Sequence, residues 1–500
     1  MVTKYAGFQW LKDHYFLTEY EVSHISYIGN NESIELSIKG NVVQVYGPRY
    51  KVNDEPIDHI EFALKYDDWS LDLLKAIFEK MAIEEISLYI HHTPSAKMTR
   101  KIGFLYEFLT GNEINLAHTF KGNYIDLLDD KKYFTGSTIK NVKWKINNNL
   151  IGNEEYCPIV RKTKSLLMLL AIDVKEKIKT LKENYAPEIF NRAVNFLYNK
   201  ETRSSYEIEK EMPSAHRTEK FVSLLLRAGT TETDKMISRE RLIQLQNAIV
   251  DARFASEDYR DYQNFVGEIL SNYQDLIHYI CPPPSMVNGL MGGLKASWLN
   301  TKAMPAPIRA AIISFGFVFI HPFEDGNGRL HRFLIHDILA HDAIVPSGVI
   351  IPISAHILHH IKEYDSILEK YSKPLLKRIK YDKNVKGDIT ISNLEAIDGY
   401  YRYPDLTPQC EYLLQTIHAT INEDMPNELL FLQRYNEVKN EIQQIVDMPD
   451  RDINQMLILL HQNKGILAKR KRDQFSKLTD TEIGRMEIAF KSVFEIDQSK

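Results

Sequence analysis

Two kinds of hydrophobic patterning divide the chain, and the change between them falls near residue 165. Before it, apolar residues alternate with polar ones over 34–38 and 43–45 around a Lys-Gly-Asn turn at 39–41, which predicts a β-hairpin. Ser70 precedes apolar residues at helical spacing, so we expect a helix with Ser70 as its N-cap. The segment 111–151 is rich in asparagine and glycine, which is typical of loops. Residues 1–160 are therefore expected to form a small α/β domain.

Beyond residue 165 the apolar positions recur with the period of an α-helix. The stretch 310–320 is apolar throughout, a polar run follows, and apolar residues return at helical spacing over 330–339. The polar run is therefore expected to be a loop between two buried helices. After a polar stretch near 385, further helices are expected at 408–422, 428–446 and 451–462. The pattern predicts a mainly α-helical fold, with a helical core over 165–385 and a helical C-terminal domain over 386–500.

The polar run at 321–332 reads His-Pro-Phe-Glu-Asp-Gly-Asn-Gly-Arg-Leu-His-Arg and contains groups that suit a triphosphate. Its turn consists of Gly326, Asn327 and Gly328. Backbone N–H groups in such a turn, at the N-terminus of a helix, form a site for anions. Arg329 and Arg332 are three residues apart, so they share one helix face and can reach adjacent phosphates. The alternative is a capped turn between helices with solvated arginines.

Two further side chains of the run suggest reaction chemistry. Asp325 is a hard oxygen ligand of the kind that holds magnesium beside phosphates. His321, at the loop entrance, can take up a proton near neutral pH. The chain lacks the Gly-x-x-x-x-Gly-Lys-(Ser/Thr) loop of the common ATPases, so that class of enzyme is unsupported. His356 and His360 share a helix face but have no third ligand at zinc-site spacing.

The run matches every fixed position of the Fic domain signature, His-x-Phe-x-(Asp/Glu)-Gly-Asn-Gly-Arg-x-x-Arg, and the chain is similar to that family. The resemblance implies a protein adenylyltransferase that moves AMP from ATP to a Ser, Thr or Tyr hydroxyl of a target protein, with Mg²⁺. By position, His321 would deprotonate the hydroxyl and Asp325 would hold the metal. The Gly-Asn-Gly turn would bind phosphate, and Arg329 and Arg332 the β and γ groups. Tyr364 lies where Fic proteins line the adenine pocket, although a core tyrosine is an equal alternative.

A second motif lies more than a hundred residues upstream of the first. Ser204 and Glu207 have the spacing of a capping box, so a helix is expected to begin here. Many Fic proteins carry an inhibitory helix with the pattern (Ser/Thr)-x-x-x-Glu-(Gly/Asn), which Ser205 and Glu209 resemble over 204–212, with Lys210 in place of Gly or Asn. A Glu209 carboxylate paired with Arg332 would occupy the γ-phosphate position. The alternative is an exposed carboxylate with no such role.

Two β-rich segments, 262–268 and 276–281, precede three consecutive prolines and predict a hairpin near 262–281. Fic domains place a flap here, and the resemblance implies that its exposed edge pairs with an extended target segment. The alternative is an ordinary structural hairpin.

Composition and charge bear on whether the protein binds nucleic acid or a membrane. The net charge of −5 and pI near 6.4 give no global basic field, so nucleic acid is an unfavoured partner, and the basic run 469–472 is more typical of a solvated helix end. Three dispersed cysteines, no signal segment and no bilayer-length apolar run predict a cytoplasmic protein without a membrane partner. Two rival functions stay open, a hydrolase that removes AMP using the same site, and a regulatory module that binds nucleic acid or a partner. A homo-oligomer is also open.

Overall fold

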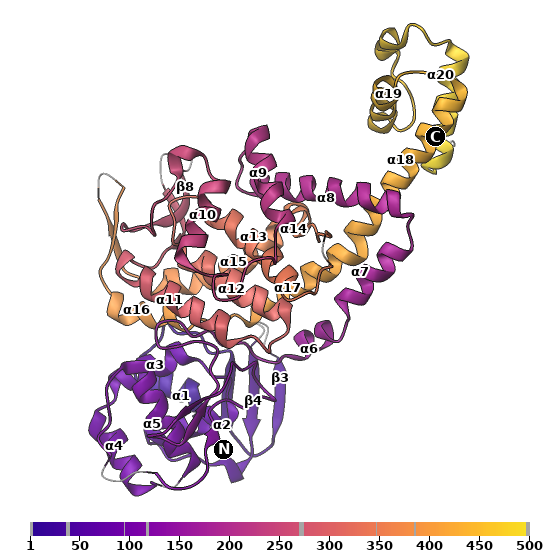
Figure 1. The fold of residues 1–500 in the computed structure, drawn as a ribbon. Helices are drawn as coiled ribbons and strands as arrows, with labels where there is room; N and C mark the ends of the chain where they lie inside the picture. The colour runs from indigo at the N-terminus through magenta and orange to yellow at the C-terminus, as the bar shows by residue number, and fades with distance from the viewer. Residues whose placement is uncertain are drawn as a thin grey trace.

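The computed structural model describes residues 4–496 except 37–40, 95, 117–119, 270–274, 347 and 385–386. The chain is mainly α-helical, as predicted, with small sheets at its N-terminal end and two hairpins beside the central helices. Figure 1 shows an N-terminal domain below a helical core, and a C-terminal group of helices carried away from the core on α18. None of the described helices is long and apolar enough to cross a membrane.

The N-terminal domain combines a twisted four-stranded sheet, in the order β1-β2-β4-β3, with five helices. Its sheet is formed by β1 (Lys4–Ala6), β2 (His24–Ile28), β3 (Ser33–Leu36) and β4 (Val42–Tyr46). Its helices are α1 (Gly7–His14), α2 (Pro56–Tyr66), α3 (Leu71–Lys80), α4 (Ile83–His92) and α5 (Lys97–Thr110), with a 3₁₀ turn at Pro48–Tyr50. A second sheet in the order β5-β7-β6 contains β5 (Ile125–Asp126), β6 (Ile139–Asn141) and β7 (Ile146–Asn148).

Several predicted features of this domain are confirmed. Antiparallel pairing of β3 with β4 gives the predicted hairpin, although positions 39 and 40 of its turn lie outside the described residues. The Ser70 side chain accepts a hydrogen bond from the Leu73 backbone N–H and caps α3. The segment 111–151 contains the small second sheet as well as loops, because strands of two or three residues are too short to show a period in the sequence.

The helical core is built around α12, whose fifteen residues are all buried. The helices of the core are α6 (Lys164–Leu170), α7 (Val174–Glu183), α8 (Pro187–Ile208), α9 (Ala215–Leu226), α10 (Arg239–Ile249), α11 (Pro284–Asn300), α12 (Ala306–Ile320), α13 (Asn327–His341), α14 (Ile353–His359), α15 (Ile361–Arg378), α16 (Leu394–Arg402) and α17 (Thr407–Ala419). Two hairpins belong to it, one of β8 (Phe265–Ile269) with β9 (Asp275–Ile280), the other of β10 (Tyr381–Lys383) with β11 (Ile389–Ile391). The core thus encloses the predicted polar loop between α12 and α13.

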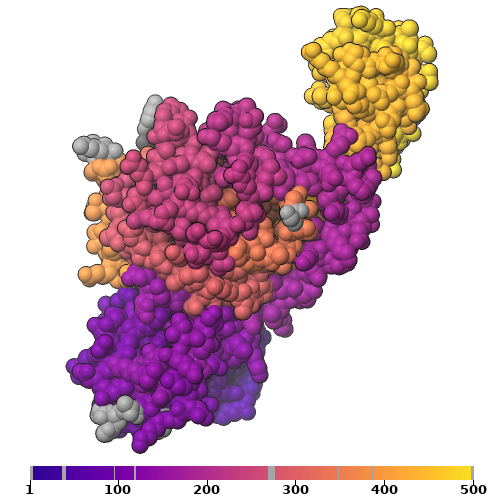
Figure 2. Space-filling view, in the orientation of Figure 1, coloured from indigo at the N-terminus to yellow at the C-terminus, as the bar shows by residue number. Residues whose placement is uncertain are grey.

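The C-terminal helices begin a separate hydrophobic cluster later than the predicted boundary at 386. Buried residues up to Leu429 belong to the core cluster, whereas the C-terminal cluster begins at Val438. A π-helical turn, Thr420–Asp424, joins α17 to α18 (Met425–Ile445), so the two predicted helices form one rod. The rod carries α19 (Asp450–Gln462), a 3₁₀ segment (Lys469–Phe475) and α20 (Asp480–Val493), which form a distinct lobe in Figure 2. Arg472 of the basic run pairs with Asp480.

The predicted start of a helix at Ser204 is wrong. These residues form the last turn of α8, which begins at Pro187, with proline in the first helical position where its missing N–H costs nothing. Ser204 and Ser205 are buried inside the helix, and the spacing of a capping box arises there by coincidence. The segment therefore presents the C-terminus of a helix to the core, not its N-terminus.

One glycine makes the packing of the N-terminal domain testable. A Cβ added to Gly103 in α5 would lie 2.1 Å from the ring of the buried Trp144, too close without movement of the tryptophan. We expect Gly103→Ala to lower the free energy of unfolding by about 1–3 kcal/mol. In α11, by contrast, nothing lies within 4 Å of a Cβ on Gly292, so Gly292→Ala should stabilise by up to about 1 kcal/mol. Urea unfolding followed by tryptophan fluorescence compares them, and equal midpoints would contradict the packing.

Candidate functional site

The polar motif forms a tight loop between two buried helices. α12 ends at His321, whose backbone adopts the left-handed conformation (φ 54°, ψ 58°), and α13 begins after Gly326, which has φ 87°. The Asn327 amide closes the loop, donating to the Phe323 carbonyl at 2.8 Å and accepting from the Phe323 N–H at 3.1 Å. Phe323 is fully buried against the core. The loop is therefore fixed by one buried ring and one amide clasp.

A second anchor of this loop is Arg260, for which no role was predicted. Its Nε donates to the His321 carbonyl oxygen at 2.8 Å, and its backbone N–H donates to the Pro322 carbonyl at 2.9 Å. One terminal nitrogen donates to the Pro282 carbonyl at 2.6 Å. This buried guanidinium thus ties the motif loop to the base of the β8–β9 hairpin. An isolated arginine before a predicted strand carries no sequence signal for such a role.

His321 is held in a neutral, oriented state. Its Nδ1 lies 3.1 Å from the Val318 carbonyl oxygen, and a proton on Nδ1 donated to that oxygen leaves Nε2 free to accept one. The pKa of His321 is lowered to about 4, chiefly because burial disfavours the imidazolium and in part because of the positive charge of Arg260; the Val318 carbonyl, Glu209 and Asp325 oppose this with smaller effects. The imidazole is therefore unprotonated at pH 7 and can act as a base.

Arg332 binds the end of α8. Its Nε donates to the Ser205 hydroxyl at 3.0 Å, and one terminal nitrogen donates to the Ser205 carbonyl at 2.7 Å and to the Glu209 carboxylate at 2.8 Å. Burial alone would lower the pKa of Arg332, but the Glu209 carboxylate and the Tyr364 hydroxyl beside it outweigh that effect and raise it. The structure thus brings Arg332 together with Ser205 and Glu209, which lie more than a hundred residues before it in the sequence.

The Glu209 carboxylate also lies over the N-terminus of α13. A Cβ on Gly328 would be 2.2 Å from Glu209 Oε1, so only glycine leaves room for the carboxylate there. The first turn of a helix carries unpaired backbone N–H groups and a partial positive charge, which favour an anion. Glu209 therefore occupies the position where the predicted phosphate site would bind a negative group.

The end of α8 has the hydrogen bonds of a Schellman motif. The Lys210 N–H donates to the Glu207 carbonyl at 2.9 Å, and the Glu211 N–H donates to the Tyr206 carbonyl at 3.1 Å. Lys210 has φ 58°, the left-handed conformation that glycine and asparagine adopt most readily. The Gly or Asn expected after the glutamate thus corresponds to this left-handed position of the C-terminal cap, which Lys210 occupies here.

The first motif arginine is paired as well, with a residue that the sequence did not single out. Arg329 donates to both carboxylate oxygens of Glu211, at 2.9 and 3.1 Å, and to Asp325 Oδ1 at 2.5 Å. Asp325 also accepts from the Gly326 N–H at 2.6 Å. A second acid two residues after Glu209 was the one available signal for Glu211.

Asp325 is suited to magnesium in its chemistry and its exposure. Its side chain is 32% exposed at the entrance of the site, and one of its oxygens accepts the bonds from Arg329 and Gly326. Among the described residues no group of three acids, histidines or cysteines could hold a metal ion. Magnesium commonly uses one or two carboxylates and completes its shell with phosphate and water. Asp325 therefore fits a metal that arrives with a nucleotide.

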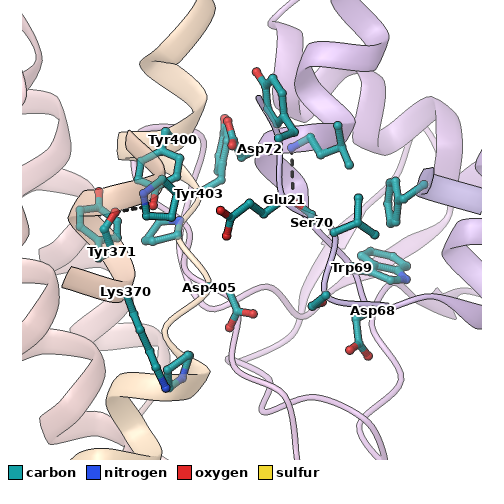
Figure 3. A pocket seen from close by; sticks show the side chains of 18 of the residues that line it. Glu21, Asp68, Trp69, Ser70, Asp72, Lys370, Tyr371, Tyr400, Tyr403 and Asp405 are labelled. Atoms are coloured by element: carbon teal, nitrogen blue, oxygen red, sulfur yellow. Dashed lines mark hydrogen bonds between the residues drawn. The ribbon is translucent and has the colours of Figure 1, made fainter. Parts of the chain in front are cut away.

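Two other sets of side chains lie apart from the motif. His356 pairs with Asp424 at 2.7 Å and stacks on His360, which gives both rings structural contacts. A cavity of about 390 Å³ separates the N-terminal domain from α15 and the end of α16, and Figure 3 shows Glu21 and Asp405 beside it. None of the residues 321–332 lines that cavity, so it belongs to the domain junction.

Comparison with known proteins agrees with the motif. Residues 236–339, which include the whole loop, match the family model described as Fic/DOC family. The chain is also similar to the solved structure of a Fic family protein from Desulfovibrio desulfuricans G20, with 17% identity and a TM-score of 0.39 over 59% of this chain and 83% of that one. A Fic domain containing signaling protein from Bacteroides thetaiotaomicron VPI-5482 has 18% identity and a TM-score of 0.35, over 52% and 96%. The similarity to the Fic/DOC family therefore lies in the sequence match over residues 236–339.

The lowered pKa of His321 can be measured directly. We expect its ring proton resonances, assigned by comparison with His321→Ala, to stay constant between pH 7.5 and 5.5 and to titrate near pH 4, because burial disfavours the imidazolium. Proton NMR of the protein over this range, with a histidine peptide as the reference, provides the test. A midpoint near 6.5, the ordinary value for histidine, would contradict the described environment.

Proposed function

We propose that the domain that contains residues 236–339, which match the Fic/DOC family model, transfers AMP from ATP to a hydroxyl side chain of a target protein. One observation carries the proposal: the complete signature lies on the α12–α13 loop, with a neutral histidine at one end and two arginines at the other. Those groups match what nucleotidyl transfer needs, a base for the acceptor and cations for the departing phosphates.

In this proposal His321 activates the acceptor. Nε2 takes the proton of the target hydroxyl while Nδ1 stays bonded to the Val318 carbonyl, which keeps the ring oriented. The acceptor oxygen forms a bond to the α-phosphorus of ATP, the bond between that phosphorus and the β-bridging oxygen breaks, and pyrophosphate leaves in line. The left-handed backbone of His321 and the Arg260 contact support this role, because they hold the base at the loop entrance.

The rest of the loop would bind the triphosphate. Backbone N–H groups at the start of α13, with Gly326, Asn327 and Gly328, suit its negative oxygens. Arg329 and Arg332 would pair with the β and γ groups, and Tyr364, next to Arg332, would lie toward the adenine side. Asp325 would hold Mg²⁺, which supplies positive charge that offsets the charge on the phosphates.

The resting protein would be inhibited by its own Glu209. This carboxylate pairs with Arg332 and lies over Gly328, so a γ-phosphate would meet a negative charge in place of a cation. ATP could then bind only with its α-phosphorus out of line with the acceptor. The buried pair of Glu201 with His336, at 2.7 Å, supports this arrangement because it fastens α8 to α13 one helical turn and more from Arg332.

The β8–β9 hairpin is the proposed docking edge for the target. It leaves the core beside the motif loop, where Tyr279 donates to the Phe319 carbonyl at 2.5 Å. An extended target segment that adds to the β8 edge would place a hydroxyl near His321 through backbone bonds alone. The chemistry thus supports a partner with an exposed, extended segment that carries Ser, Thr or Tyr.

Loss of the proposed base should separate chemistry from nucleotide binding. We expect His321→Ala to reduce AMP transfer by roughly 10²–10⁴-fold, because the acceptor loses its general base, and to leave ATP affinity nearly unchanged. Transfer from α-labelled ATP and calorimetric ATP titration measure the two quantities. Transfer at the wild-type rate with normal ATP binding would remove His321 from this role.

Removal of the Glu209 carboxylate should activate the enzyme. We expect Glu209→Gly to raise auto-modification and target labelling by about tenfold or more, roughly 1.4 kcal/mol, since the γ-phosphate gains Arg332. ATP should also bind more tightly. The gain should vanish in Glu209→Gly combined with Arg332→Ala. Exposed Glu207 offers a matched control, because Glu207→Gln removes an equal charge two residues away.

Two results would contradict the inhibitory role. Equal labelling by wild type and Glu209→Gly, at matched ATP and Mg²⁺, would show that the carboxylate restrains nothing. If Glu209→Gly released AMP from a pre-modified target more slowly than wild type, the rival hydrolase would be favoured, in which the same carboxylate orients a water molecule.

A further inference from the structure

We propose that Glu211 sets the affinity for ATP by acting through Arg329, and that Arg217 determines how strongly it does so. The inference rests on the proposed binding of phosphate by Arg329. Glu211 is thus a positioning residue: it touches the arginine that would bind the nucleotide, not the nucleotide itself.

The contact between Glu211 and Arg329 is bidentate, and its arginine side is buried. Glu211 Oε1 lies 2.9 Å from one terminal nitrogen of Arg329, and Oε2 lies 3.1 Å from the other. The Arg329 side chain is 1% exposed, whereas that of Glu211 is 33% exposed. A fork-to-fork pair of this kind uses the same two N–H directions that would bind a phosphate. A β-phosphate can therefore use this pair of terminal N–H groups only after the carboxylate moves away.

The end of α8 places both of its acids on the motif. Glu209 is the C-cap of the helix and Glu211 follows the left-handed Lys210, so the Schellman turn directs both carboxylates toward α13. Glu209 binds Arg332, and Glu211 binds Arg329. Each arginine expected to bind phosphate is thus covered by a separate carboxylate from one short segment. Removing Glu209 frees only one of the two arginines.

A second arginine competes for Glu211. Arg217 in α9 donates to Glu211 Oε2 at 3.0 Å and is itself anchored on the Ile249 carbonyl, at 3.2 and 3.4 Å. The Tyr206 ring contacts both cations, with its centroid 5.0 Å from the Arg217 guanidinium and 5.2 Å from that of Arg329. Glu211 is therefore shared by a fixed cation at the rim and a buried cation in the site.

This sharing gives the two neighbours opposite effects on ATP binding. When a β-phosphate takes Arg329, Glu211 keeps its bond to Arg217 and needs to give up only one partner. Loss of the Glu211 charge should therefore strengthen ATP binding. Loss of Arg217 should weaken it, because Glu211 then has Arg329 as its one cation and resists displacement. If Glu211 and Arg217 only stabilised the structure around Arg329, loss of either side chain would weaken ATP binding.

The test is calorimetric titration with Mg²⁺ and the α,β-methylene analogue of ATP, whose α–β linkage cannot be cleaved. All variants carry Glu209→Gly, so that Arg332 is free and the affinity reports on Arg329. We expect Glu211→Gln to lower Kd about fivefold and Arg217→Gln to raise it by a similar factor. The double variant should match Glu211→Gln alone. Glu211→Asp keeps the charge, so its Kd should lie between those of Glu211→Gln and the Glu209→Gly parent. Glu207→Gln is the matched control, and its Kd should equal that of the parent.

Several outcomes would overturn the proposal. A Kd unchanged or raised by Glu211→Gln, or an Arg217→Gln effect that persists without Glu211, would do so. If Arg217→Gln does not fold, Arg217→Lys replaces it, and an unchanged Kd in both Glu211→Gln and Glu211→Asp decides against the idea. If the Kd values of the variants follow the expected order but the protein transfers no AMP, the proposed reaction alone would be refuted. An analogue that binds no variant would refute both.

Discussion

The ion pair between Arg332 and Glu209 is the interaction around which the site is arranged. Arg332 is buried in α13, and a buried guanidinium without an anion is costly, so some negative group must lie beside it. In the resting chain that group is Glu209, the C-cap of α8, supported by the Ser205 hydroxyl and carbonyl. A nucleotide would offer another anion for the same cation. In the proposed function, nucleotide binding and inhibition would therefore compete for the same buried cation.

A rigid frame makes that competition effective. α12 is buried along its whole length, Phe323 and the Asn327 clasp fix the loop, and Arg260 ties it to the hairpin. Because close-packed interiors do not deform continuously, the loop cannot make room for a carboxylate and a phosphate together. The end of α8 is the more exposed partner, since the side chains of Glu209 and Glu211 are both about one third exposed. Movement is therefore expected in α8, not in α13.

The sequence predicted the parts of this site that are local and left out those that depend on distant contacts. Contiguous patterns were enough for the mainly helical fold, the loop between two buried helices, the β8–β9 hairpin and the Ser70 cap. The direction of α8 was missed because a capping box is defined by two residues, and Ser204 with Glu207 meets that spacing inside a helix. Glu211 and Arg260 were missed because the motif residues that they contact, Arg329 and His321, lie sixty or more residues away in the sequence. The roles of His321, Asp325 and Tyr364 stay predictions.

The most direct test of the central claim is a pair of crystal structures, wild type and Glu209→Gly, each with Mg²⁺ and the α,β-methylene analogue of ATP. The account predicts a γ-phosphate within hydrogen-bond distance of the Arg332 guanidinium in the variant. In the wild type Glu209 should retain Arg332, with the γ-phosphate displaced and the α-phosphorus turned away from His321. A wild-type structure in which Arg332 binds the γ-phosphate while Glu209 stays in place would contradict the account, because one cation would then serve both anions.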